Sequence, residues 1–235
     1  MTISTTARRR AWLCLAVGAA LLSVVFARAQ EPKRASAGDD AKAREEVERA
    51  AAETRPANIN VNPFIGLAEQ GRMLVETGRI GADTTLDMTA TAELREDGTL
   101  KPESVKIEWR AVADEEVAQL ARRLLTAISQ SKILAVLKDS TRTVRLTARL
   151  DRDNLAFGLK SEFASEAQAM QWATGYGMMI TVARKTKGGT DAGRFYEAVR
   201  VASEGKAIEV TFEMPKVFAA KMVAEMMDKR AAGRP

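Results

Sequence analysis

Carboxylates, lysines, serines and tyrosines are the side chains of this 235-residue chain that could do chemistry, because it has no histidine and a single cysteine, Cys14. The usual zinc sites, haem ligation and histidine-based nucleophile–base pairs are therefore excluded. Asp151, Asp153 and Asn154 are close enough in sequence to offer oxygens to a calcium ion. They lack the glycine and distal glutamate of a calcium-binding loop, so we interpret them as a solvated hairpin turn.

Two further motifs resemble parts of known functional sequences, one catalytic and one phosphate-binding. Ser129-Gln130-Ser131-Lys132 matches the S-x-x-K of penicillin-binding enzymes, but the chain lacks the S-D-N and K-T-G partners. Lys187-Gly188-Gly189-Thr190 lacks the spaced glycines and the Lys-Ser/Thr pair of a phosphate loop. We interpret the first as polar residues at a helix end and the second as a flexible loop, and we predict no catalytic residue, cofactor site or metal site.

Aromatic and methionine side chains gather between residues 167 and 183, a segment that glycines 175 and 177 interrupt. Methionine fills irregular gaps in cores, so we interpret this cluster as core. The alternative is an exposed groove that binds an apolar ligand or partner, contacted by Trp172, Tyr176, Met178 and Met179. Because glycine weakens a helix interior by about 1 kcal/mol, either a close backbone contact compensates or the helix is irregular there.

The elements that position the candidate residues begin with a pair of strands followed by a helix. Apolar and polar residues alternate from Leu86 to Arg95 and again from Val105 to Arg110, and Asp97-Gly98 between them suits a hairpin turn. Asp114 is placed to cap a helix with apolar residues at helical spacing through Ile128. A hairpin alone is not stable, so the helix is expected to cover its apolar face.

The same pattern recurs twice, with alternating pairs at 144–163 and 199–214. Ser165 is expected to cap the second helix, and Pro215 to open a last helix that carries Phe218, Met222, Val223 and Met226. The predicted fold class is α+β: an antiparallel sheet of about six strands built from repeated ββα units, with helices packed on one face. The other face, with Lys106, Arg110, Arg145 and Arg149, is interpreted as solvated, and the alternative is a phosphate-binding patch.

The segment Ala92-Glu93-Leu94-Arg95-Glu96-Asp97-Gly98-Thr99-Leu100 and its helix resemble the C-terminal domain of TonB and TolA type energy transducers over about residues 86–150. That resemblance implies a periplasm-facing domain that pairs with partner proteins through the edges of its sheet. The chain departs from the family in lacking its proline-rich linker and the histidine of its N-terminal apolar segment, and in its further ββα units.

The N-terminus has the form of an export signal. Arg8-Arg9-Arg10 precedes the uncharged run Ala11 to Phe26, and Ala27-Arg28-Ala29 matches the small-x-small site of signal peptidase. As a helix the run spans roughly 24 Å, short of the ~30 Å hydrocarbon core, which favours cleavage over retention as an anchor. Ordinary secretion is favoured over the twin-arginine route. From Gln30 onward the chain has 32 Lys+Arg (36 minus four) against 31 Asp+Glu, so a nucleic-acid-binding surface is not indicated.

These observations predict a signal peptide or N-terminal anchor (1–29), a charged Ala-rich tether (30–57), an α+β domain (58–230) and a tail (231–235). The leading hypothesis is an exported, non-enzymatic bacterial envelope protein with a TonB-like protein-interaction domain and an envelope protein as partner. The alternative is a secreted binding protein for an apolar small ligand, and an exported hydrolase using carboxylates comes third. The expected location is the periplasm or outside the cell, or the inner membrane facing the periplasm if Ala11 to Phe26 is retained.

Overall fold

The computed structural model describes residues 60, 62–79 and 83–222. The predicted signal peptide, tether and tail lie outside the described residues, as do Val223 and Met226 of the predicted last helix. In chain order the elements are α4 (Asn62–Glu76), β1 (Leu86–Glu93), η1 (Pro102–Ser104), β2 (Lys106–Val112), α5 (Glu115–Ser131), η2 (Ile133–Leu137), β3 (Ser140–Leu150), β4 (Asn154–Phe163), α6 (Glu166–Lys187), α7 (Asp191–Ala198), β5 (Val199–Glu204) and β6 (Ala207–Pro215). A further helix occupies 216–222.

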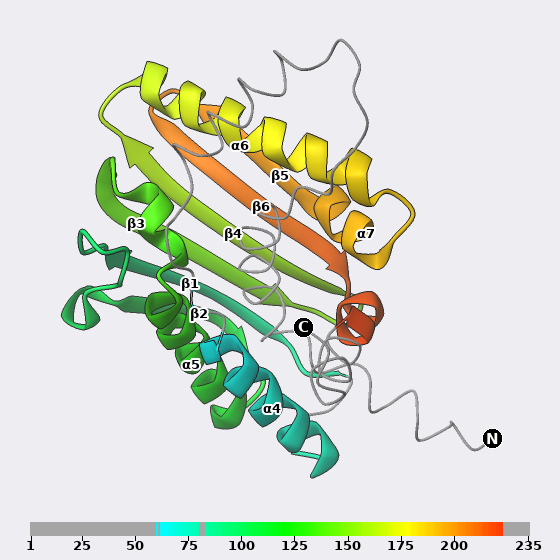
Figure 1. Ribbon diagram of the computed structural model, residues 1–235. Coiled ribbons are helices and arrows are strands. Elements are labelled where there is room, and N and C mark those ends of the chain that lie inside the picture. Colours follow the sequence, from blue (N-terminus) through cyan, green and yellow to red (C-terminus); the bar gives the residue numbers. More distant parts are fainter. Residues whose placement is uncertain (1–59, 61, 80–82, 223–235) are drawn as a thin grey trace.

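The strands form one antiparallel six-stranded sheet in the order β2-β1-β3-β4-β6-β5 (Figure 1). Its hairpins are β1–β2, β3–β4 and β5–β6, and they join through the pairs β1–β3 and β4–β6. This arrangement confirms the predicted α+β fold. The alternation of apolar and polar residues along each strand puts every second side chain on the same face of the sheet. Leu94, Leu146 and Val210 are buried there, and Ile107 near the β2 edge is half-buried.

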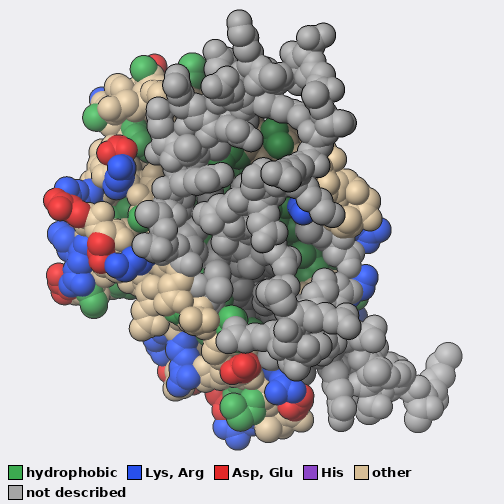
Figure 2. All heavy atoms as spheres, viewed as in Figure 1, with side chains coloured by type: hydrophobic (Ala, Val, Ile, Leu, Met, Phe, Trp, Pro, Cys, Tyr) green, Lys and Arg blue, Asp and Glu red, His purple; other side chains and the backbone are tan. Residues whose placement is uncertain are grey.

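Helices cover the apolar face in two groups. Figure 1 shows α4 and α5 over the β1–β2 end of the sheet, and α6 with α7 over the β5–β6 end. The core joins both groups to the strands through residues such as Leu120 of α5, Tyr176 of α6 and Met88 of β1. Acidic and basic side chains are interspersed near the β1–β2 turn (Figure 2), where Lys101 pairs with Glu93 at 2.6 Å and Arg142 with Glu96 at 3.0 Å.

The helix starts predicted at Asp114 and Ser165 are confirmed. The Asp114 carboxylate accepts a hydrogen bond from the Val117 amide at 2.9 Å, and the Ser165 hydroxyl accepts one from the Gln168 amide at 3.3 Å. Lys132 takes the left-handed conformation (φ 57°) and ends α5. The chain then makes the short η2 helix, whose Ile133, Leu134 and Leu137 are buried, as the density of apolar residues there indicates.

Three features differ from the sequence-based expectations. Helix α6 runs unbroken past glycines 175 and 177, and an added Cβ on either would meet nothing within 4 Å, so neither an irregularity nor a close contact is present. Helix α7 was not predicted. It follows the loop at residues 188–190, and the Thr190 hydroxyl caps it by accepting a hydrogen bond from the Gly193 amide at 3.1 Å. Pro215 ends β6 instead of opening the next helix.

Candidate functional site

The Ser129–Lys132 motif lies at the C-terminal end of α5. The Ser129 hydroxyl accepts a hydrogen bond from the Leu100 amide at 2.9 Å, which ties the hairpin to the end of α5. The buried Ser131 hydroxyl donates to the Ile128 carbonyl at 2.7 Å. Lys132 is half exposed, with its Nζ 3.7 Å from a carboxylate oxygen of Asp97. These partners agree with the interpretation of polar residues at a helix end.

Asp151 lies in the turn between β3 and β4. One carboxylate oxygen of Asp151 accepts from the Asp153 amide at 2.9 Å and from the Asn154 amide at 2.7 Å. These backbone hydrogen bonds hold the pKa of the Asp151 carboxyl below its usual value, since they stabilise its charged form. Within the described residues no group of three or more His, Cys, Asp or Glu side chains could hold a metal ion.

The predicted contact residues on α6 separate into two sets. Trp172 and Tyr176 are buried and stacked, with ring centroids 4.0 Å apart, and the Trp172 indole donates to the Val136 carbonyl at 3.1 Å. Met179 packs against the core, whereas Met178 is 51 % exposed. The structure thus brings Trp172 and Tyr176 together and turns Met178 to solvent, so the methionines do not line one groove.

An apolar groove lies where the two helix groups face each other across the sheet. The space inside it is about 60 Å³, and Trp172 of α6 lines it together with Leu124 and Ile128 of α5. The floor is formed by strands β1, β3, β4 and β6. Every side chain that lines it is apolar except Thr147: Met88, Leu124, Leu125, Ile128, Ile133, Leu134, Val136, Leu146, Ala148, Phe157, Leu159, Trp172, Val210 and Phe212.

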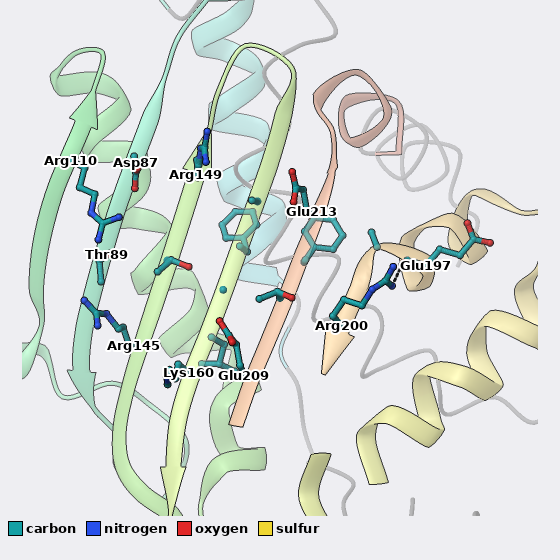
Figure 3. Close-up of a pocket in the computed structure, with 18 residues that line it drawn as sticks. Asp87, Thr89, Arg110, Arg145, Arg149, Lys160, Glu197, Arg200, Glu209 and Glu213 are labelled. Atoms are coloured by element: carbon teal, nitrogen blue, oxygen red, sulfur yellow. Dashed lines mark hydrogen bonds between the residues drawn. The ribbon is translucent and has the colours of Figure 1, made fainter. Parts of the chain in front are cut away.

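The opposite face of the sheet carries a polar hollow of about 910 Å³ (Figure 3). Across its floor the cross-strand neighbours Thr89, Thr147, Gly158 and Thr211 form one row of small residues. Charged side chains surround this row: Asp87, Arg110, Arg145, Arg149, Lys160, Glu197, Arg200, Glu209 and Glu213. Alternation correctly put Arg110, Arg145 and Arg149 on this face, but the sequence did not indicate that the face is hollowed.

Gly158 is required for the shape of this floor. A Cβ at residue 158 would lie 2.3 Å from the Thr147 hydroxyl oxygen, so the Thr147 side chain covers the position that any larger residue would need. A glycine inside a strand often marks such a close approach.

Comparisons of the chain with protein-family models, curated proteins and solved structures found no match. Among the described residues, no helix combines the length and the apolar character that crossing a membrane requires.

Proposed function

We propose that the protein is an exported, non-enzymatic binding protein that takes an unbranched hydrocarbon chain into the apolar groove. The observation that carries this proposal is the lining of the groove, in which side chains from both helix groups and from four strands are apolar. Binding sites for small ligands are typically concave, mostly apolar and placed between secondary-structure elements. Export is supported by the basic N-terminus, the apolar run and the small-x-small site of the sequence.

The size of the groove limits how much of a ligand it can bury. An engineered apolar cavity of roughly 150 Å³ binds benzene, whereas the space here is about 60 Å³. The groove therefore takes in a few methylene groups of a hydrocarbon chain, and each buried CH₂ contributes about 0.8 kcal/mol. Trp172 is well placed as a rigid wall, because its stacking on Tyr176 and its hydrogen bond to Val136 fix the ring.

Binding can be measured by titrating the full-length chain with 1-decanol and following tryptophan fluorescence and heat. We expect saturable binding that is lost in Leu159→Trp, because Leu159 is a half-buried residue of the floor and the larger ring fills the groove. Met73→Trp is the matched control, since Met73 is 58 % exposed on α4. Equal binding by the wild type and Leu159→Trp would rule out the groove as the site.

Export has a test of its own. N-terminal sequencing of the protein recovered from outside the cytoplasm of a bacterial host is expected to begin at Gln30. A chain that starts at Met1 and sediments with membranes would instead support retention of Ala11 to Phe26 as an anchor.

Pairing with an envelope protein through the sheet edge is the second candidate function. Among the described residues, strand β2 pairs with β1 alone, and its hairpin has the Asp97-Gly98 turn of the TonB-like resemblance. Charges and a β-bulge are common ways of protecting such an edge. Arg110 and the bulge opposite Asp87/Met88 therefore restrict pairing to the segment from Lys106 to Trp109.

A photo-crosslinking residue at Glu108, on this edge, tests the second candidate against the same residue at Glu204 on the β5 edge. A partner peptide crosslinked at 108 alone, and mapped to an extended segment, is the expected result. Crosslinks of equal yield at the two edges would contradict it.

A further inference from the structure

Thr89 of β1 lies on the face of the sheet opposite the apolar groove. It lies in the row of small residues that forms the floor of the polar hollow, yet it is only 4 % exposed. Its hydroxyl has no hydrogen-bond partner among the described residues. Because buried hydroxyls are nearly always hydrogen-bonded, this one points to a ligand that bonds it.

Two guanidinium groups approach the same point. Figure 3 shows Arg110 of β2 and Arg145 of β3 reaching toward Thr89 from opposite sides. A β-bulge places Arg110 here: Asp87 is opposite Ala111 and Met88 is opposite Trp109, so Arg110 has no partner residue on β1. Bulges commonly re-aim a side chain in this way.

The two guanidinium groups of this cluster have no ion-pair partner in the described part of the chain. Among the described residues neither Arg110 nor Arg145 forms an ion pair or a side-chain hydrogen bond. Arg145 lies directly opposite Lys160 on β4, a like-charge pair that is unfavourable, and Glu209 of β6 lies opposite Lys160 on its other side. Asp87 and Glu108 occupy neighbouring positions on this face, but neither is within 4.0 Å of a guanidinium nitrogen of Arg110 or Arg145.

The other charges of the hollow have different roles. Arg149 pairs with Asp151 at 3.4 Å, and Arg200 donates to the backbone carbonyl of Glu197 at 2.5 Å. Glu209 and Glu213 lie on β6, across the floor from Arg110. The hollow is thus basic toward β2 and β3 and acidic toward β6.

We propose that the polar hollow binds a phosphate monoester, with the phosphate held between Arg110 and Arg145. A phosphate monoester carries a charge of about −1.5 to −2 at neutral pH, which matches two guanidinium groups, and each planar fork can bind two of its oxygens. The Thr89 hydroxyl donates to a phosphate oxygen, and Lys160 adds positive charge. The organic part of the ligand lies over Thr147, Gly158 and Thr211, where Glu209 and Glu213 accept hydrogen bonds from its hydroxyl groups.

Calorimetric titration of the full-length chain with glucose 6-phosphate, at constant ionic strength, tests this proposal. The phosphomonoester is expected to bind and glucose is not. Arg110→Gln and Arg145→Gln are each expected to weaken binding at least tenfold, whereas Arg152→Gln, an equal charge change on the exposed β3–β4 turn, leaves it unchanged. Undiminished binding in Arg110→Gln and Arg145→Gln, or an equal loss in Arg152→Gln, overturns the site. Binding of phosphatidate vesicles without binding of glucose 6-phosphate overturns the assignment to a soluble ligand.

The role of the hydroxyl is tested separately. Thr89→Val keeps the shape of the side chain and removes its donor, so glucose 6-phosphate is expected to bind several-fold more weakly, and Thr89→Ser is expected to restore most of the affinity. A Thr89→Val chain that binds as tightly as the wild type overturns the contact assigned to Thr89.

Discussion

The two faces of the sheet use the same strands for opposite purposes. On the helix-covered face, Leu146 is 7 % exposed and lines the apolar groove, while its neighbour Arg145 points into the polar hollow on the other face. The helix-covered face is stabilised by the burial of apolar side chains, an effect that does not depend on the direction of individual contacts. The other face holds charges that have few partners within the chain. We infer that the first face carries most of the stability and that the second is free to carry recognition.

The largest expected effect is the difference in stability between a variant of Leu146 and a variant of Arg145. Leu146→Ala removes buried methyl groups beside the groove and is expected to lower the free energy of unfolding by about 2–5 kcal/mol. Arg145→Gln, on the exposed side, is expected to change it by no more than about 0.5 kcal/mol. Urea denaturation of both variants measures this, and comparable losses would contradict the division between the faces.

Gly158→Ala is expected to have an intermediate effect, because it acts on the polar face through packing. The added Cβ would lie 2.3 Å from the Thr147 hydroxyl oxygen, so the Thr147 side chain or the strand must shift, at about 1–3 kcal/mol. In the background of Thr147→Ala the same change should cost nothing or stabilise the strand. A double-mutant cycle by urea denaturation separates the two residues, and an equal cost in both backgrounds would exclude this contact.

Thr89→Val is expected to stabilise the free protein by about 1 kcal/mol, because it removes a buried hydroxyl that has no partner among the described residues. Ser161, a buried residue on the helix-covered face, should behave in the opposite way. Its hydroxyl donates to the Thr143 carbonyl at 2.9 Å, so Ser161→Ala should destabilise the folded protein. Thermal unfolding of the two variants without ligand gives the comparison. A lower melting temperature for Thr89→Val would show that its hydroxyl is satisfied.

The smallest effect at neutral pH concerns Tyr176, a titratable group on the apolar face. Burial raises the pKa of its phenol above the ordinary value, so the folded state holds the proton more tightly than the unfolded chain does. The resulting stability is complete below about pH 10, the pKa of an unfolded tyrosine, and is lost as the pH rises further. The midpoint of urea denaturation should therefore fall more between pH 9 and pH 11 in the wild type than in Tyr176→Phe. Equal slopes would mean that the ring reaches water in the folded state.

Much of this architecture could be predicted from the sequence, because its signals are local. Strict alternation placed Leu146 and Arg145 on opposite faces, and Asp114 and Ser165 marked helix starts through side chains that cap amides three residues away. Helix α7 was missed because it has eight residues, one of them a glycine, and follows a Gly-Gly pair that is typical of a loop.

The candidate sites were less predictable, because they depend on contacts between strands. Nothing in the residues from Lys106 to Val112 indicates a bulge at Arg110, since the register is set by pairing with β1. The burial of Thr89 likewise results from side chains on neighbouring strands. Trp172 and Tyr176 were identified from composition, but only the helix geometry shows that they face inward while Met178 faces solvent.

The close contact between the first hairpin turn and η2 limits where the chain can be lengthened. Gly98 has a φ of 79°, and a Cβ there would lie 2.3 Å from the Ala135 amide nitrogen, so the turn rests against the backbone that follows α5. At the β5–β6 turn the nearest atom to a Cβ on Gly205 is a Glu166 carboxylate oxygen at 3.6 Å, and the Lys206 carbonyl accepts a hydrogen bond from the Phe163 amide at 2.8 Å. An epitope tag or a circularly permuted terminus therefore belongs between residues 204 and 205 and not at 97–98.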